Sequence, residues 1–157
     1  MEEIFYLTKE GLERLKKEYQ ELKRIKKEKL KGEFPKILHS EDLNPEYIAF
    51  KEDFGFLESR INELEHVLNN YKLITPPPKG KRDKVQIGAT VTLEEEDGSI
   101  NEFTIVGTLE ANPAEGKISY LSPVGKALLG KKLGEKVVIT SPIKVVYKVK
   151  KIKYQIS

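Results

Sequence analysis

The segment from Tyr47 to Tyr71 repeats apolar side chains at an alternating spacing of three and four residues. Its apolar positions are Tyr47, Phe50, Phe54, Leu57, Ile61, Leu64, Leu68 and Tyr71. On a helix this spacing keeps one narrow stripe on a single face, which is the pattern of a coiled-coil seam. Such a helix buries its stripe only against a partner. The chain therefore needs a second helix of the same kind.

The partner is the N-terminal segment, which carries a matching stripe at Leu12, Leu15, Tyr19, Leu22 and Ile25. Thr8 is a good N-cap residue, and the helical pattern continues from there to about Leu38. Gly32 and Pro35 interrupt the pattern. Because proline removes a backbone donor and clashes with the preceding turn, we expect a kink or break between Lys31 and Lys36.

A short acidic turn, Asp42–Tyr47, joins the two segments. Asn44 is a candidate cap for the second helix, and Pro45 suits its first turn because a missing N–H costs little there. The second helix should continue to about Tyr71. Two amphipathic helices joined by so few residues fold back on each other, so the sequence predicts an antiparallel helical hairpin with carboxylates at its far end.

Three consecutive prolines within Ile74–Gly80 mark a change in the pattern and favour an extended, semi-rigid spacer. We therefore predict a coiled-coil domain at residues 1–75, a linker at 76–83 and a C-terminal domain at 84–157. In that last part the apolar residues alternate with polar ones, as in half-buried strands. Asp97-Gly98 is a hairpin signal, and Ser122-Pro123 begins a short helix that ends before Gly130. The strands are expected near residues 85–93, 103–107, 137–139 and 145–152. The predicted fold class is α+β, with an antiparallel sheet and one helix after the coiled-coil hairpin.

Composition excludes several classes of protein. The 157 residues include no cysteine, which excludes disulfides and thiolate metal sites. No apolar run approaches the roughly 20 residues of a membrane span, and the N-terminus lacks the features of a signal peptide. We expect a cytoplasmic protein with no membrane partner. Phosphate loops, zinc signatures and nucleophile elbows are absent, so the chain is not expected to be an enzyme by itself.

Two charged groups have chemical potential. Glu41, Asp42 and Glu46 lie together at the end of the hairpin, and Mg²⁺ is often held by one or two carboxylates together with groups from another molecule. The other interpretation is that these acids only keep an exposed turn soluble. The first helix carries a basic strip that includes Lys23, Arg24, Lys26 and Lys27. This strip is either an RNA-binding surface or an ordinary solvated helix face.

These residues together resemble the Gre family of bacterial transcript-cleavage factors, GreA and GreB, and GreA more closely. The resemblance lies in Tyr6-Leu7-Thr8 with Gly11, in residues 46–52 and 55–61, in residues 87–91 and in residues 118–119 and 122–130. It covers nearly the whole chain. It implies that the C-terminal domain has a fold similar to the FK506-binding proteins and that Ser122 and Pro123 take part in binding bacterial RNA polymerase.

The resemblance also implies a mode of action. The coiled coil would enter the secondary channel of the polymerase and bring its acidic tip to the active centre. There the tip would help to hold a Mg²⁺ ion supplied by the polymerase, since the chain has no cofactor of its own. The polymerase would then cleave the nascent RNA 3′ end of a backtracked complex. We expect the chain to be a monomer.

The tip departs from the family pattern. Asp42-Leu43 is followed directly by Asn44-Pro45-Glu46-Tyr47, so the turn is about two residues shorter than in the family. Asp42 matches the first essential acid, while the second has no counterpart, and Glu41 or Glu46 is the candidate to replace it. Two alternatives therefore stay open: a channel-binding regulator or inhibitor that does not cleave, and a prolyl-isomerase relative with an unrelated coiled coil.

Overall fold

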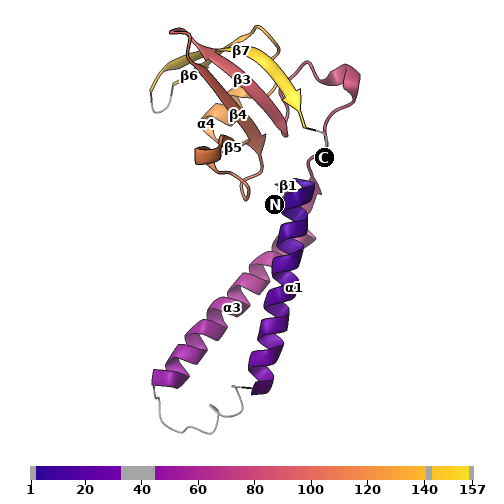
Figure 1. Ribbon diagram of the computed structural model, residues 1–157, viewed down its shortest axis with the longest axis vertical. Coiled ribbons are helices and arrows are strands. Elements are labelled where there is room, and N and C mark those ends of the chain that lie inside the picture. Colours follow the sequence, from indigo (N-terminus) through magenta and orange to yellow (C-terminus); the bar gives the residue numbers. More distant parts are fainter. Residues whose placement is uncertain (1–2, 33–44, 141–142, 156–157) are drawn as a thin grey trace. The chain divides into compact units, whose positions relative to one another are not determined.

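The computed structural model describes residues 3–32, 45–140 and 143–155 (Figure 1). Contacts divide the chain into two units, of which the first is Leu12–Tyr71 and the second is Glu3–Gly11 together with Lys72–Ser157. Residues 3–11, which the sequence analysis placed in the coiled-coil domain, therefore pack with the C-terminal part. Among the described residues, none of the helices has the length and apolar character needed to cross a membrane.

The first unit is the predicted helical hairpin of α1 (Lys9–Gly32) and α3 (Pro45–Asn69). The buried positions of α3 are Phe50, Ile61, Leu64 and Val67, and Leu12 is buried on α1. Most of these residues belong to the two predicted stripes, which confirms the seam. The expected break between Lys31 and Lys36 falls almost entirely outside the described residues, because the description of α1 ends at Gly32.

The C-terminal end of α3 differs from the prediction. The helix ends at Asn69, and the backbone N–H of Asn70 bonds to the Val67 carbonyl at 3.1 Å. The Asn70 side chain donates to the His66 carbonyl at 2.8 Å and so occupies a carbonyl that the helix end leaves without a helical partner. Val67 is buried in this turn while Leu68 is half-buried. Tyr71 lies beyond the helix, in a strand.

That strand belongs to a small sheet that the sequence analysis missed. β1 (Phe5–Leu7) pairs with β2 (Tyr71–Leu73), and the Leu7 carbonyl accepts a hydrogen bond from the Ile74 N–H at 2.8 Å. Each strand has three residues, which is too short for an alternating pattern to identify. Leu7 is fully buried, so the N-terminal segment is firmly packed.

The second unit contains a five-stranded sheet in the order β5-β4-β3-β7-β6. The strands are β3 (Ala89–Glu95), β4 (Ile100–Val106), β5 (Lys117–Ser119), β6 (Lys136–Ile139) and β7 (Val145–Tyr154). The predicted hairpin joins β3 to β4, with Gly98 at φ +89°. All pairs are antiparallel except β4 with β5. This pair is parallel because the chain crosses back through residues 107–116 before β5 begins.

The core of this unit lies between the sheet and α4 (Pro123–Leu128), which Figure 1 shows beside the strands. Its most fully buried large side chains are Val85, Val91, Leu93, Ile105, Leu128, Val137 and Val149. Tyr154 ties the incoming chain to β7, because its hydroxyl donates to the Lys84 carbonyl at 2.7 Å and accepts the Gln86 N–H at 2.9 Å. The predicted short helix and C-terminal strands are thus confirmed.

Two residues of the second unit, Thr8 and Glu110, cap the start of α1. Thr8 Oγ1 accepts the Gly11 N–H at 3.0 Å, as the sequence predicted. The Glu110 carboxylate, 102 residues away, accepts the Thr8 N–H at 2.8 Å and the Thr8 hydroxyl at 2.5 Å. A Cβ on Gly11 would lie 2.5 Å from Glu110 Oε1, so glycine is what allows this approach. A carboxylate at a helix N-terminus also stabilises the helix through its interaction with the helix dipole.

We expect Thr8→Ala to lower the free energy of unfolding by about 1 to 2 kcal/mol, because the substitution removes the hydroxyl that caps the helix and donates to Glu110. Urea denaturation followed by circular dichroism measures this change. Thr108→Ala, at an exposed threonine, is the matched control and should stay within about 0.5 kcal/mol of the wild type. Equal effects of the two variants would contradict the capping role.

Candidate functional site

The predicted acidic tip is only partly within the described residues. Glu41 and Asp42 lie outside them. Glu46 lies in the first turn of α3 and is exposed, while Tyr47 next to it is half-buried. Carboxylate oxygens are the donors that Mg²⁺ prefers, so Glu46 has suitable chemistry. Within the described part of the chain, no group of three His, Cys, Asp or Glu residues could hold a metal ion.

The two helices that carry the tip are joined by polar contacts across the seam, which the sequence analysis did not identify. Arg60 on α3 donates two hydrogen bonds to Glu18 on α1, from Nε to Oε1 at 2.7 Å and from Nη2 to Oε2 at 3.1 Å. These bonds hold the pKa of Glu18 below its usual value. The Tyr19 hydroxyl donates to Glu65 at 2.7 Å, which raises the pKa of Tyr19. The bidentate pairing of Arg60 with Glu18 adds geometric specificity to the seam.

Aromatic rings continue the seam toward the acidic turn. Phe50 and Phe54 stack with their ring centroids 5.8 Å apart. The Lys29 ammonium lies 5.9 Å from the Phe50 ring centroid, and the Lys26 ammonium lies 5.9 Å from that of Phe54. Cations at this distance over an aromatic face are attracted by the ring quadrupole. Two lysines of α1 are therefore part of the helix pairing and not only of the solvated surface.

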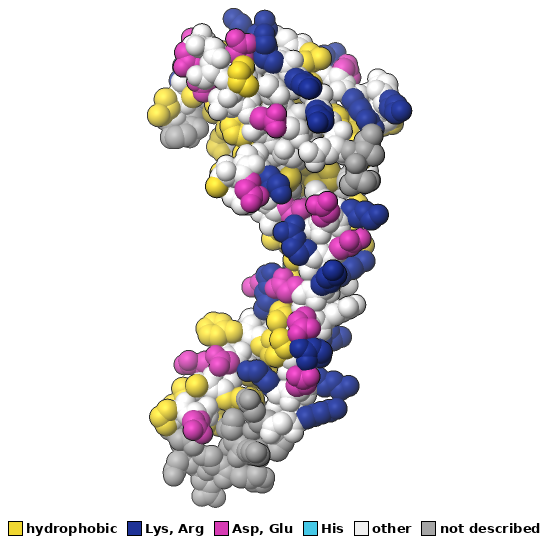
Figure 2. Space-filling model, viewed as in Figure 1, with side chains coloured by type: hydrophobic (Ala, Val, Ile, Leu, Met, Phe, Trp, Pro, Cys, Tyr) yellow, Lys and Arg dark blue, Asp and Glu magenta, His cyan; other side chains and the backbone are white. Residues whose placement is uncertain are grey.

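The structure separates the four predicted RNA-binding residues into two kinds. Arg24 pairs with Glu21 and with Glu28, the latter at 2.6 Å, and Lys26 pairs with Glu58 at 3.5 Å. Lys23 and Lys27 are exposed, although the Lys23 ammonium also lies 5.1 Å from the Tyr19 ring centroid. Figure 2 shows basic side chains gathered along the α1 side of the first unit. Lys23 and Lys27 are therefore the members best placed to meet a phosphate backbone.

Ser122 and Pro123, which were predicted to bind the polymerase, form the start of α4. Ser122 Oγ accepts the Gly125 N–H at 3.1 Å and donates to the Ser119 carbonyl at 2.7 Å, while Pro123 occupies the first turn. Capping explains both residue types without a partner. Leu121 beside them is 49% exposed, so this corner also presents an apolar side chain. Their role in partner binding stays a prediction.

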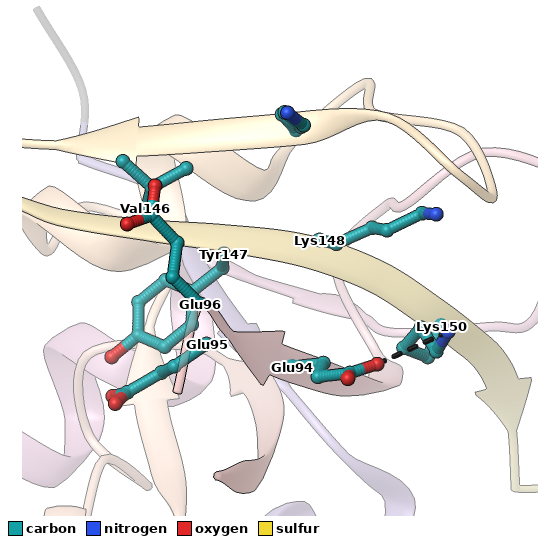
Figure 3. Close-up of a pocket in the computed structure, with 8 residues that line it drawn as sticks. Glu94, Glu95, Glu96, Val146, Tyr147, Lys148 and Lys150 are labelled. Atoms are coloured by element: carbon teal, nitrogen blue, oxygen red, sulfur yellow. Dashed lines mark ion pairs between the residues drawn. The ribbon is translucent and has the colours of Figure 1, made fainter. Parts of the chain in front are cut away.

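A separate shallow depression of about 250 Å³ lies over β3, β6 and β7 (Figure 3). Two of its acids have partners: Glu94 pairs with Lys150 across the depression at 3.1 Å, and Glu95 accepts a hydrogen bond from Asn101 at 3.3 Å. Burial, together with the neighbouring Glu95 carboxylate, raises the pKa of Tyr147. The lining contains both acids and bases and is open to solvent, so it does not indicate a particular class of ligand.

Comparison with known proteins matches both parts of the chain to one family. Residues 5–73 match the N-terminal domain of the transcription elongation factors GreA/GreB, and residues 79–154 match their C-terminal domain. Transcription elongation factor GreA of Thermomicrobium roseum is 43% identical over 138 residues, which cover 87% of this chain and 88% of that protein. GreA of Bacillus subtilis (strain 168) is 40% identical over 144 residues, or 90% of each chain.

Among solved structures, the GreA factor homolog 1 (Gfh1) of Thermus thermophilus is similar at 29% identity. The match covers 96% of this chain and 99% of that one, with a TM-score of 0.43. Family membership follows from the sequence matches and not from this superposition. Two adjacent family domains that together span most of the chain, and relatives at 40% identity or more, lead to one conclusion: the chain belongs to the GreA/GreB family of transcription elongation factors.

Proposed function

We propose that this chain is a transcription elongation factor that enters the secondary channel of RNA polymerase and stimulates the polymerase's own cleavage of backtracked RNA. The observation that carries the proposal is the combination of the two matched GreA/GreB domains with an acidic turn at the end of the helical hairpin. Cleavage would free a new RNA 3′ end in the active centre, and the arrested complex would resume elongation.

In this proposal the polymerase is the enzyme and the chain supplies a side chain in trans. The Mg²⁺ ion belongs to the polymerase, and when bound it stabilises charge and lowers the pKa of an attacking water. The chain's contribution is positional: Asp42, with Glu41 or Glu46, would orient that water and complete the ligands of the ion. The cross-helix bonds of Arg60 with Glu18 would stiffen the hairpin that carries these acids.

A cleavage assay on stalled elongation complexes tests the proposal. Backtracked complexes with radiolabelled RNA are incubated with the purified protein and Mg²⁺, and the RNA is resolved on a gel. We expect the factor to shorten the RNA and to restore elongation when nucleotides are added. If the RNA stays intact while the protein competes with an authentic cleavage factor for the polymerase, the chain is a channel-binding regulator and the proposal is wrong.

The exposed lysines of α1 offer a second test, on the contact with RNA. We expect the double substitution Lys23→Gln and Lys27→Gln to weaken the action of the factor on complexes with long backtracked RNA. Each lost phosphate contact to a single strand should reduce the slope of log affinity against log salt by about 0.7, so the pair should reduce it by about 1.4.

Two exposed lysines of the second unit provide the matched control, Lys79→Gln with Lys81→Gln, which changes the charge by the same amount. This control should leave the salt slope unchanged. Lys26 is left intact in the test variant because its pairing with Glu58 would confuse RNA binding with helix pairing. A test variant that behaves like the control would make the strip an ordinary solvated surface.

A further inference from the structure

The outer face of α3, opposite the seam, presents apolar side chains to solvent. Phe56 is 75% exposed and Ile48 is 44% exposed, whereas Phe50 on the seam is 7% exposed. Residues 48, 52, 55, 56 and 59 fall on one side of the helix because they recur every three to four positions. Figure 2 shows exposed hydrophobic side chains on the α3 part of the first unit with acidic side chains beside them. Exposed apolar side chains that share one face and have charged neighbours are typical of an interaction surface.

Gly55 lies in the interior of α3 and next to Phe56, and neither its backbone nor its described neighbours require a glycine. A Cβ built on it would meet nothing within 4 Å, and its φ is not in the left-handed range. Gly11 and Gly107 differ, because close neighbours occupy the space that a side chain would need. Glycine is less favourable than alanine inside a helix, so Gly55 weakens α3, and no contact among the described residues requires a glycine there. Close approach by another molecule would compensate for this loss of helix stability.

The charges around this face indicate what that molecule carries. Glu52 precedes Gly55 by almost one helical turn, and Asp53 flanks Phe56 at the same spacing. Both are exposed, as is Glu46 at the start of the helix, against the single base Lys51 in this stretch. An apolar centre with an acidic rim complements an apolar centre with a basic rim, because such pairing satisfies the rim charges and excludes wrong partners.

We propose that the Gly55 face, defined as Ile48, Glu52, Gly55 and Phe56, docks on a polymerase segment that inserts an apolar side chain over Gly55 and places lysine or arginine beside Glu52. This inference rests on the proposed function, because it takes the polymerase channel as the partner. The face lies on the helix that follows the acidic turn. Its contact with the polymerase would hold α3 in a fixed position while the tip acts. The face does not include the carboxylates that are proposed to act in cleavage.

The small size of the face argues against a second copy of the chain as the occupant. Stable dimers bury on the order of 1,200 to 2,000 Å² in total, and this face offers two large apolar side chains. A contact of that size contributes within a larger interface, where one aromatic anchor often carries much of the binding energy. The polymerase channel would provide the rest of that interface.

The sharpest test is Gly55→Ala, for which stability and binding should change in opposite directions. Alanine favours the helix, so we expect the unfolding midpoint to rise by about 2 to 4 °C. The added methyl group should prevent close approach, so the affinity for core polymerase should fall about tenfold. Affinity is measured by competition with a fluorescently labelled wild-type factor. Phe56→Ala should also lower the affinity about tenfold, with the fold intact by circular dichroism.

The matched controls lie on α1. Gln20→Ala replaces an exposed helix residue by alanine, and Leu30→Ala removes an apolar side chain that is 40% exposed. Both should bind the polymerase like the wild type. Unchanged affinity of Gly55→Ala and Phe56→Ala would overturn the docking face. It would also be overturned if sedimentation showed wild-type self-association that Phe56→Ala abolishes, because the occupant would then be a second copy.

The binding assay separates this inference from the proposed function. If the wild type binds polymerase through this face but does not stimulate cleavage, the proposed function fails and the docking face stands. If the wild type cleaves and the variants bind and cleave normally, the docking face fails and the proposed function stands. If the wild type does not bind polymerase at all, both fail.

Discussion

Replacing Asp42 by alanine should lower the rate of transcript cleavage at least about 100-fold at saturating factor. The resemblance to the family implies that Asp42 is its first essential acid, and the expected loss corresponds to about 2.7 kcal/mol of transition-state stabilisation. A carboxylate that orients water beside a metal ion acts only in the transition state, so the substitution should change the rate and leave binding intact. Single-turnover cleavage of a stalled complex measures the rate.

Two further variants identify which acid works beside Asp42. Glu46→Gln keeps the size of an exposed side chain in the first turn of α3 and removes its charge. Glu41→Gln removes the charge of Glu41, which precedes Asp42 in the sequence. We expect one of the two to lose activity and the other to keep it, since the proposed mechanism uses one carboxylate beside Asp42. Full activity of Asp42→Ala, with binding unchanged, would contradict the assignment of the tip.

The second large effect is expected on folding, from Gly107→Ala in the turn that follows β4. A Cβ at this position would lie 3.0 Å from the carbonyl carbon of Tyr6 and closer still to its oxygen. Backbone cannot rotate away as a flexible side chain can, so the N-terminal strand would have to move. Over-packing of this kind costs about 1 to 3 kcal/mol and occasionally more, and we expect the upper end of that range. Urea denaturation measures the change.

A matched control is Gly80→Ala, because a Cβ on Gly80 would meet nothing within 4 Å. It should leave the free energy of unfolding within about 0.5 kcal/mol of the wild type. The Tyr6 ring packs edge-on against Tyr120 with ring centroids 5.2 Å apart. The near-ultraviolet circular dichroism of these rings should therefore also change in Gly107→Ala. A variant as stable as the control would mean that Tyr6 is not held against Gly107.

Local signals in the sequence were sufficient for much of the fold. The seam is visible because Phe50, Ile61 and Leu64 recur at helical spacing, and burial follows that spacing. The Asp97-Gly98 hairpin and the Ser122 cap were predictable because turns and caps depend on a few adjacent residues.

Features that depend on distant residues were not predictable. Glu110 caps α1 from 102 residues away, and nothing in its own neighbourhood indicates that role. The parallel pairing of β4 with β5 depends on how a ten-residue crossover runs, which periodicity does not describe. The sequence also could not show which lysines of the basic strip are paired, because Lys26 on α1 pairs with Glu58 on the other helix, α3. In the predicted site, Glu46 is described and exposed, while Glu41 and Asp42 rest on the sequence alone.

The packing of residues 3–11 with the C-terminal unit has a consequence for how the protein is made. Thr8 leaves the ribosome well before its capping partner, because Glu110 is translated about a hundred residues later. The amino end of α1 therefore stays unfinished until most of the chain has been synthesised. A fragment that stops in the proline spacer would lack Glu110 and leave the Thr8 N–H without its carboxylate partner, so it would be a poor substitute for the helical hairpin of the whole protein.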